Sequence, residues 1–580
     1  MEYKKTLNLP QTDFPMRAEL VQREPERLAR WYADGLYEQI QKRREGAERF
    51  LLHDGPPFAN GDVHIGTALN KILKDFILKY QTLRGKHVPY VPGWDCHGLP
   101  IEFKVTQQMR KDGNTDATPA TIRKACEKYA LEFVDKQREQ FKRLGVLGEW
   151  DNPYLTLHPE YEAEELRLFA ELVDKGFVYR GKKPVYWSIP CRTALAEAEV
   201  EYQDHVSQSV YVKFPIVGET DMHLLICTTT PWTLPANLAV AYNSRFDYQL
   251  IRVGDEALLV SVPLLDTIVE KCGWAGEFEI LRTVQSDEMA ELEYHHPFCN
   301  RTGKLFAGDM FVDNSAGTGL VHIAPGHGQD DYNLGRANGL PIYSPVDDTG
   351  CLTRTADLPE EQQIPDELVG KQILERKGKC EANDAVIEVL KAGNRLAFEE
   401  RYEHSYPHCW RSKTPVIFRA MDQWFVNIDH DGFRDKALAA IDSVNWLPGW
   451  GRNRIESAVK SRPDWCISRQ RSWGVPIPAF YDAQGEPILD ARIVRKTADL
   501  VQEHGSNVWF EREFADLWAA VKPDDWDGAE PVAKSTDTLD VWIDSGSSSR
   551  AVLMQRSELG RPGAEAGSTD AWQADYYLEG

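Results

Sequence analysis

Residues 55–67 have the sequence Gly-Pro-Pro-Phe-Ala-Asn-Gly-Asp-Val-His-Ile-Gly-Thr and follow a short apolar stretch at 49–54. The glycines and prolines favour a tight turn in which the backbone can approach a ligand closely. The following residues predict a helix from about Gly66, with one buried face formed by Leu69, Ile72, Leu73, Phe76, Ile77 and Tyr80. A strand, a glycine-rich loop and a helix in this order are typical of the start of a nucleotide-binding α/β fold.

The beginning of this predicted helix has the properties of a phosphate site. Its first backbone N–H groups have no partner within the helix, and the positive end of the helix dipole lies there. His64 stands at this end and can donate a hydrogen bond to charge that develops during phosphoryl chemistry. The stretch therefore predicts a nucleotide-binding site.

The composition is that of an ordinary globular protein. The chain has 580 residues, of which 42% are hydrophobic and 27% charged, so disordered and fibrous classes are excluded. Its length suggests about three to five domains. A net charge of −23 argues against a broad basic surface for nucleic acid but leaves room for local basic tracks. No signal peptide and no apolar run long enough to span a membrane are found, so a cytoplasmic protein without membrane contact is expected.

The texture of the sequence changes along the chain. Helical patterns occupy 24–46, 119–145 and 159–177, whereas short β-rich stretches separated by turn residues fill the region from about 200 to 400. Aromatic and helical segments return from about 405. This order predicts an α/β domain interrupted by a long insertion, with domain bounds at 1–200, 201–400 and 401–580.

Several longer motifs resemble class I aminoacyl-tRNA synthetases, and among them the bacterial isoleucyl type. They are the stretch at 55–67, Asp13-Phe-Pro-Met-Arg-Ala, Pro92-Gly-Trp-Asp-Cys-His-Gly-Leu-Pro-Ile-Glu102, Leu195-Ala-Glu-Ala-Glu-Val-Glu-Tyr202 and His404-Ser-Tyr-Pro-His-Cys-Trp410. Valyl and leucyl relatives would be expected to differ in the segment 96–101. The resemblance implies a Rossmann-type catalytic domain with a parallel sheet, split by a β-rich editing domain.

The resemblance also implies roles for residues of the two catalytic segments. His64, Gly66 and Thr67 match the His-x-Gly-His signature that binds ATP, with threonine in place of its last histidine. A threonine hydroxyl donates one hydrogen bond but never carries a charge, which implies slower adenylate formation or compensation by the helix N-terminus. The matching substrate-binding residues are Pro56, Asp95, Trp473, Glu579 and Gly580. Asp95 would hold the amino group of isoleucine, Pro56 and Trp473 its side chain, while Glu579 and Gly580 would border the adenylate.

A third constellation lies in the β-rich insertion. A cluster of hydroxyls at 228–233 and a glycine-rich segment at 314–331 together resemble the editing site of the family, with the matching residues Thr228, Thr229, Thr230, Trp232, His322 and Asp331. By this resemblance Asp331 would anchor the amino group of a misacylated product, the threonines would position the ester and a water, and His322 would help to exclude the cognate side chain. Editing is needed because one methylene in an apolar pocket gives only about 1–3 kcal/mol of discrimination, a limit established on isoleucine-specific synthetases themselves.

The expected reaction is ATP-dependent activation of isoleucine and its transfer to tRNA(Ile), with hydrolysis of valyl products. Mg²⁺ would accompany ATP. The ten cysteines are scattered singly, and each candidate zinc pair, at 188–191 and 409–412, lacks one sulfur, so no metal site is expected. A monomer is expected.

Two alternatives stay open. The string Lys-Met-Ser-Lys-Ser, which the family uses to stabilise the ATP phosphates, does not occur in these residues. The chain would then be a truncated fragment that is inactive in aminoacylation, with only the editing domain competent. The other alternative is a non-catalytic tRNA-binding module derived from a synthetase.

Overall fold

The computed structural model describes residues 3–8, 12–13, 17–114, 116–375, 378–560 and 573–578. The chain forms two compact units. Unit 1 consists of Met1–Lys175 together with Arg471–Gly580, and unit 2 consists of Gly176–Gln470. Two distant segments of the chain therefore build one unit, and the continuous segment between them builds the other.

Unit 1 alternates helices with short strands. Its helices are α1 (Leu20–Ala33), α2 (Leu36–Arg44), α3 (Ile65–Leu83), α4 (Leu99–Lys111), α5 (Pro119–Arg143), α6 (Pro159–Asp174), α13 (Ala491–His504), α14 (Asn507–Glu511), α15 (Phe514–Val521) and α16 (Val541–Gly546). Its strands are β1 (Leu52–His53), β2 (Gly93–Trp94), β3 (Tyr154–Leu155), β19 (Phe480–Tyr481), β20 (Pro487–Ile488), β21 (Ala533–Lys534), β22 (Thr538–Leu539) and β23 (Tyr576–Tyr577).

Parallel pairing in unit 1 joins parts of the chain that are far apart. β1 pairs in parallel with β23, and β2 pairs in parallel with β3. The loop after β1 continues this pattern through a parallel bridge from Phe58 to Asp95. Since these strands are buried and alternate with helices, the predicted α/β class is confirmed.

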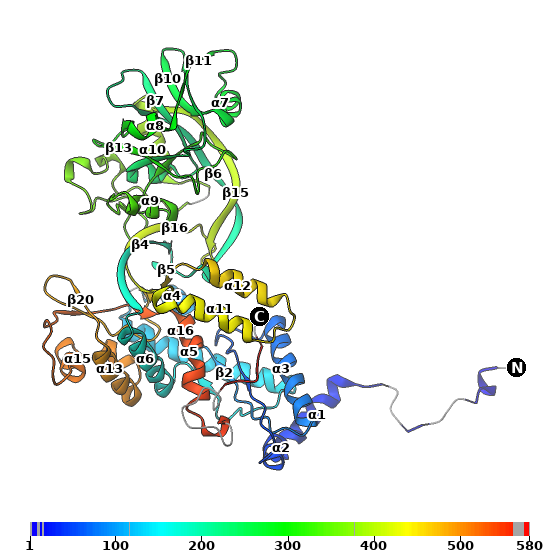
Figure 1. Cartoon of the computed structure of the whole chain (residues 1–580). Coiled ribbons are helices and arrows are strands. Elements are labelled where there is room, and N and C mark those ends of the chain that lie inside the picture. Colours follow the sequence, from blue (N-terminus) through cyan, green and yellow to red (C-terminus); the bar gives the residue numbers. More distant parts are fainter. Residues whose placement is uncertain are drawn as a thin grey trace. The chain divides into compact units, whose positions relative to one another are not determined.

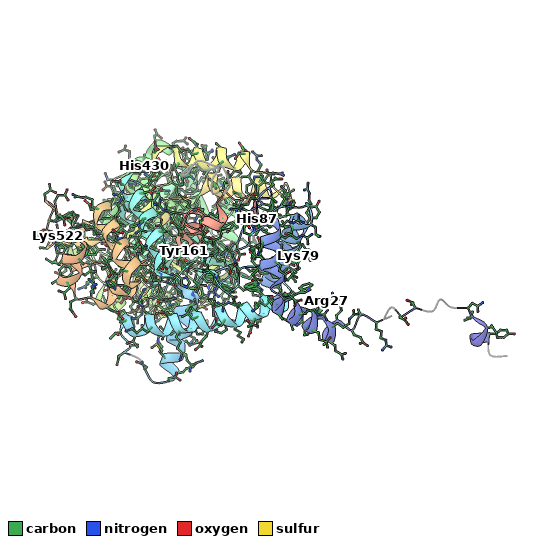
Figure 2. All side chains as sticks on the ribbon, turned by 90° about the horizontal axis from the view of Figure 1, so that it is seen from below. Arg27, Lys79, His87, Tyr161, His430 and Lys522 are labelled. Carbon is green, nitrogen blue, oxygen red and sulfur yellow. The ribbon has the colours of Figure 1, made fainter. Side chains whose placement is uncertain are left out.

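Lys79 and Lys522 lie toward the outside of unit 1, whereas Tyr161 lies in its interior (Figure 2). Figure 2 shows Lys79 of α3 and Lys522, just after α15, on opposite sides of this unit. Tyr161 of α6 is 4% exposed and stacks on Tyr154 with a centroid distance of 6.0 Å. Among the residues that the model describes, no helix is long and apolar enough to cross a bilayer.

Two helices stand where the sequence predicts one from 24 to 46. α1 ends at Ala33, and α2 begins after Gly35, whose φ of 58° lies in the left-handed region. Glycine adopts this conformation without the steric cost that other residues carry, so the chain can turn here.

The expected burial of α3 is wrong. Leu69, Phe76 and Tyr80 are 57%, 62% and 59% exposed, whereas Lys71 and Lys74 are almost completely buried. The cause is Asp54, which follows β1 and draws both ammonium groups inward. The spacing of the apolar residues predicted the helix correctly, but the face that it predicted as buried is largely exposed.

Unit 2 is dominated by strands. They are β4 (Val178–Ser188), β5 (Thr193–Leu195), β6 (Val200–Pro215), β7 (Met222–Thr228), β8 (Ala239–Tyr242), β9 (Tyr248–Val253), β10 (Glu256–Ser261), β11 (Phe278–Val284), β12 (Glu293–His295), β13 (Thr302–Ala307), β14 (Leu320–Ile323), β15 (Leu396–Cys409), β16 (Ile417–Val426), β17 (Trp465–Cys466) and β18 (Ser468–Arg469). Its helices are α7 (Leu265–Cys272), α8 (Ser286–Glu291), α9 (Gln329–Ala337), α10 (Glu381–Ala392), α11 (Phe433–Ser443) and α12 (Gly451–Ser461).

Three sheets organise these strands. Their orders are β11-β9-β10-β7-β6-β15, β12-β13-β8-β14 and β17-β16-β4-β5. β6 and β15 are long antiparallel partners that run side by side in Figure 1. Aliphatic and aromatic side chains of the strands form a continuous buried core that includes Val212, Phe214, Leu224 and Val240.

The bounds of unit 2 are wider than the predicted insertion at 201–400. It begins at Gly176 because β4 pairs from Val178 to Trp187 with β16, which lies beyond residue 400. β5 and β17 join the same sheet. β4, β5, β16 and β17 therefore belong to unit 2 by their strand pairing, although all four lie outside 201–400.

Candidate functional site

The loop at 55–67 forms one wall of a cavity of about 440 Å³ in unit 1, the nucleotide cavity. Five predicted site residues line it, including Pro56. Residues of α16 and β23, from the distant C-terminal segment, complete the wall. The lining residues are Gly55, Pro56, Pro57, Phe58, His64, Gly66, Thr67, Asn70, Lys71, Asp95, Val541, Trp542, Ser545, Tyr577 and Leu578. The structure therefore brings Pro56, His64, Gly66, Thr67 and Asp95 together.

His64 is the N-cap of α3. Its Nδ1 accepts hydrogen bonds from the backbone N–H groups of Gly66 and Thr67 at 3.1 and 3.3 Å. Because Nδ1 accepts, the ring proton lies on Nε2, which is 3.0 Å from Thr67 Oγ1 and donates to it. A Cβ on Gly66 would lie only 3.0 Å from His64 Cε1, so glycine leaves space for this ring. The N–H groups that would meet a phosphate are thus covered by the imidazole.

A buried charge cluster lies directly behind the loop. Asp54 accepts from Lys71, from Lys74 at 2.7 Å and from the N–H of Gly93 at 3.0 Å. Burial alone would raise the pKa of Asp54, but the two ammonium groups hold it well below its usual range. Burial also lowers the pKa of Lys71 to about 8, against the attraction of Asp54. With both lysines charged, the cluster places one net positive charge next to the nucleotide cavity.

Asp95 is a buried carboxylate with few partners. Its Oδ1 accepts from the N–H of His97 at 3.4 Å, and the structure exposes only 4% of the residue. Burial first, and the nearby carboxylate of Asp544 second, raise the pKa of Asp95 well above its usual value. The ring of His97 is held at 2.6 Å by Asp544, which with Glu162 raises its pKa to about 9 against the effect of burial. A cationic ligand group would relieve this excess of carboxylates.

Trp473 does not line the nucleotide cavity. Its Nε1 donates to the carbonyl of Cys96 at 2.7 Å, and its ring meets that of His97 edge-on at 4.8 Å. Glu102 accepts from the backbone N–H groups of Ser472 and Trp473 at 2.9 and 2.8 Å. Trp473 therefore lies in the core behind Asp95, and its role in the side-chain pocket stays a prediction. Glu579 and Gly580 lie outside the described residues.

Sequence reasoning missed Trp542 in this cavity. Trp542 is 40% exposed and follows Asp540, the N-cap of α16. Its exposure beside buried carboxylates becomes visible only in the structure. Nothing in the sequence around residue 542 connects it with the loop at 55–67.

The predicted editing residues converge in unit 2. A cavity of about 360 Å³, the threonine cavity, is lined by Thr228, Thr229, Thr230, Thr233, His322 and Asp331, among others. The hydroxyls form a chain, in which Thr230 Oγ1 lies 3.3 Å from those of Thr228 and Thr233. Thr233 Oγ1 then meets His322 Nε2 at 3.1 Å. Thr233 belongs to the quoted motif, but no role was predicted for it.

A second cavity of about 400 Å³, the side cavity, adjoins the first. Both are lined by Thr229 and Thr230, and Trp232 lines only the side cavity. Trp232 is buried, and its backbone N–H donates to Asn383 at 3.0 Å. The predicted grouping therefore divides between two neighbouring cavities.

Burial shifts the pKa values of two histidines and one aspartate of the threonine cavity. Burial lowers the pKa of His322 and of His327 to about 4, so both imidazoles are uncharged near pH 7. Burial raises the pKa of Asp331 to about 6, although its Oδ1 accepts from the N–H of Ala324 at 2.7 Å. Asp331 Oδ2 would lie 2.3 Å from a Cβ on Gly328, so only glycine allows this approach. A carboxylate, hydroxyls and neutral imidazoles can hold an ammonium group and position a water.

Residues 188–191 and 409–412 converge as well. The side chains of Cys191, Ser188 and Ser412 act on Cys409 and lower the pKa of its thiol to about 5. In the part of the chain that the model describes, no group of three or more histidine, cysteine or acidic side chains could hold a metal ion.

A family model of class I tRNA synthetases (I, L, M and V) matches residues 26–580. The chain belongs to this family. Two relatives named isoleucine–tRNA ligase illustrate the likeness within it. The protein of Kosmotoga olearia is 48% identical over 581 residues, and that of Bacillus cereus is 46% identical over 585. Both matches cover 100% of this chain and 60% of the relative.

This class I synthetase chain thus spans about 60% of the length of the curated relatives it matches. A solved LeuRS chain from an Agrobacterium radiobacter LeuRS–tRNA–LeuAMS complex is 17% identical, with a TM-score of 0.39 over 97% of this chain and 63% of its own. That score is too low to support a conclusion on fold or function.

Proposed function

We propose that unit 1 binds ATP and isoleucine and activates the amino acid as an adenylate for transfer to tRNA(Ile). Family membership together with relatives named isoleucine–tRNA ligase supports this reading. The observation that carries it is the nucleotide cavity, in which His64 and Thr67 face the same space as Asp95 and Trp542.

The proposed chemistry divides among these residues. The isoleucine carboxylate attacks the α-phosphate of ATP, and pyrophosphate leaves. When the His64 ring turns away, the N–H groups of Gly66 and Thr67 become donors for phosphate oxygens, and the Lys71 cluster supplies positive charge. Asp95 pairs with the substrate ammonium, and Pro56 and Trp542 border the aliphatic side chain. Mg²⁺ would enter with the ATP phosphates, whose charge it neutralises.

Binding of a non-hydrolysable isoleucyl-adenylate analogue tests this proposal directly. Calorimetry should show specific binding to the chain and a valyl analogue weaker by about tenfold to a hundredfold, the range that one methylene allows. Asp95→Asn should weaken both analogues alike, because both carry the ammonium group. Equal affinity for adenosine alone and for the isoleucyl analogue would refute the proposed amino-acid site.

We further propose that unit 2 hydrolyses valyl-tRNA(Ile). The convergence of the threonine hydroxyl chain, His322 and Asp331 in one cavity favours this second function. Asp331 would hold the ammonium group, the hydroxyls would position the ester and water, and His322 would limit the side chain that fits. Release of valine from valyl-tRNA by this chain, with isoleucyl-tRNA left intact, is the expected result. A folded chain that leaves valyl-tRNA intact would refute it.

Together with an assay of isoleucine-dependent pyrophosphate exchange, these two measurements also separate the alternatives. Analogue binding without pyrophosphate exchange, together with valyl-tRNA hydrolysis, would favour a chain whose editing site alone completes its reaction. Binding of tRNA without either reaction would favour a non-catalytic tRNA-binding module.

A further inference from the structure

His97 lies in the core of unit 1 between two acidic side chains that come from different helices. It is completely buried, and its Nδ1 lies 2.6 Å from Oδ2 of Asp544 in α16. Its Nε2 lies 3.4 Å from Oε1 of Glu162 in α6. Because an ionised carboxylate accepts hydrogen bonds and donates none, an acidic group at each ring nitrogen favours the imidazolium form, in which both nitrogens carry a proton. The pKa of about 9 that both carboxylates give His97, against the effect of burial, agrees with this geometry.

Hydrogen bonds from neighbouring residues fix both acidic partners. Glu162 accepts from the backbone N–H of Ser506 at 2.8 Å and from the Ser506 hydroxyl. The backbone carbonyl of Asp544 accepts from the Tyr161 hydroxyl at 2.5 Å. These contacts hold the two carboxylates at the nitrogens of the His97 ring.

His97 also acts on Asp95, which lies two residues earlier in the chain and lines the nucleotide cavity. The backbone N–H of His97 donates to Asp95 Oδ1 at 3.4 Å. Burial first, and then the carboxylates of Asp544 and Asp540, raise the pKa of Asp95, whereas the ring charge and the N–H of His97 lower it. The negative charge of Asp95 therefore depends on His97.

Acidic groups outnumber basic ones around the imidazolium. Asp95, Glu162 and Asp544 are each at most 4% exposed. Glu165 lies nearby, but burial raises its pKa well above the usual value, so its carboxyl group is neutral. The guanidinium of Arg123 adds positive charge that acts on Glu162. Three buried carboxylates thus share the imidazolium.

Loss of the ring charge would leave these carboxylates without sufficient positive charge, and one of them would take up a proton. Glu162 would keep its hydrogen bonds from Ser506, whereas the hydrogen bond to Asp95 is 3.4 Å long. In His97→Gln the amide group can still donate to Asp544. Since hydrogen bonds stabilise the charged form, the proton would go to Asp95, which could then no longer pair as an anion with an ammonium group.

We propose that His97 is a positioning residue of the amino-acid site, whose doubly protonated ring keeps Asp95 ionised and able to pair with the ammonium group of isoleucine. This inference rests on the proposed function of unit 1. His97 acts without touching the ligand, because Asp95 lines the nucleotide cavity and His97 lies behind it. When the substrate binds, its ammonium group becomes a second cation for the three carboxylates.

The test compares two ligands by calorimetry at pH 7. One is the isoleucyl-adenylate analogue, and the other is the same analogue without its α-amino group. His97→Gln removes the ring charge, and the double variant His97→Gln/Asp544→Asn also removes one carboxylate, which returns the net charge of the group to that of the unmodified chain. His53→Gln is the matched control, since His53 is a buried histidine of unit 1 whose Nε2 lies 2.9 Å from Ser548 Oγ and whose pKa burial lowers to about 4, so that it is uncharged.

For His97→Gln we expect the affinity for the isoleucyl analogue to fall by about tenfold to a hundredfold, the usual effect of losing a charge-assisted hydrogen bond. The analogue without the amino group should bind His97→Gln and the unmodified chain alike, which also shows that the variant is folded. The double variant should regain most of the lost affinity, and His53→Gln should bind both ligands like the unmodified chain. In the unmodified chain, NMR of the His97 ring at pH 7.5 should show a proton on both nitrogens.

Several outcomes would overturn the proposal. An equal loss for both ligands in His97→Gln, without recovery in the double variant, would mean that the ring only supports the fold. Unchanged affinity for the isoleucyl analogue in His97→Gln, or a single ring proton at pH 7.5, would mean that Asp95 does not depend on an imidazolium. If the unmodified chain binds the isoleucyl analogue and His97→Gln shows one of these results, the proposed function stands and only the role of His97 fails. An unmodified chain that binds neither ligand refutes the proposed function itself, and the role of His97 with it.

Discussion

The carboxyl group of Asp331 should control the pH dependence of editing. Burial raises its pKa to about 6, and only the ionised form can pair with the ammonium group of a valyl ester. At pH 5 about one molecule in eleven then carries the ionised group, so kcat/KM should be about tenfold below its plateau. The rate should rise with pH and reach half of the plateau near pH 6.

Deacylation of valyl-tRNA between pH 5 and pH 7 measures this limb, a range in which the α-amino group of the substrate stays protonated. Asp331→Asn should lower kcat/KM by about tenfold to a hundredfold, the usual effect of losing a charge-assisted hydrogen bond, and should flatten the profile. His322→Gln should keep the limb, because His322 is already neutral throughout this range. A flat profile in the unmodified chain, or a limb that survives in Asp331→Asn, would refute the assignment.

The same pKa predicts an opposite effect on stability. The pKa of Asp331 is higher in the folded chain than in the unfolded one, so the folded state loses stability as pH rises from about 4 to about 6 and does not regain it above that. A shift of roughly two units corresponds to up to about 3 kcal/mol. Asp331→Asn should therefore slow hydrogen exchange of β14 at pH 7.5 and have little effect below pH 4. Faster exchange at pH 7.5 would contradict the electrostatic argument.

Other substitutions test unit 1. Asp54→Asn leaves the two buried lysines of α3 without their counter-ion and should destabilise unit 1 by about 3–5 kcal/mol, which urea unfolding would reveal; an unchanged midpoint would mean that the lysines rearrange. Trp542→Ala should weaken binding of the isoleucyl-adenylate analogue by about tenfold or more while adenosine binding persists. Thr67→Val removes the acceptor of the His64 Nε2 proton and should free the ring, so the NMR signals of His64 should broaden or shift. Identical His64 signals would show that the hydroxyl does not hold the ring.

Local patterns in the sequence predicted several features correctly. The helix predicted from about Gly66 begins at Ile65, within the stretch 55–67, and the β-rich region lies within unit 2. These features depend on turn chemistry and on the spacing of neighbouring residues, which the sequence contains directly. The family motifs also predicted that Thr228 and Asp331, about a hundred residues apart, share one site, and both line the threonine cavity.

Only the tertiary structure decided which faces and which distant residues meet. The apolar periodicity of α3 predicted buried Leu69 and Phe76, yet the ion pairs of Asp54 turned Lys71 and Lys74 inward, because a buried carboxylate requires its partners more strongly than a partly exposed apolar side chain requires burial. Trp542 lines the nucleotide cavity and Trp473 does not, and Trp232 lines only the side cavity. Such placements follow from long-range packing, which spacing along the chain does not record.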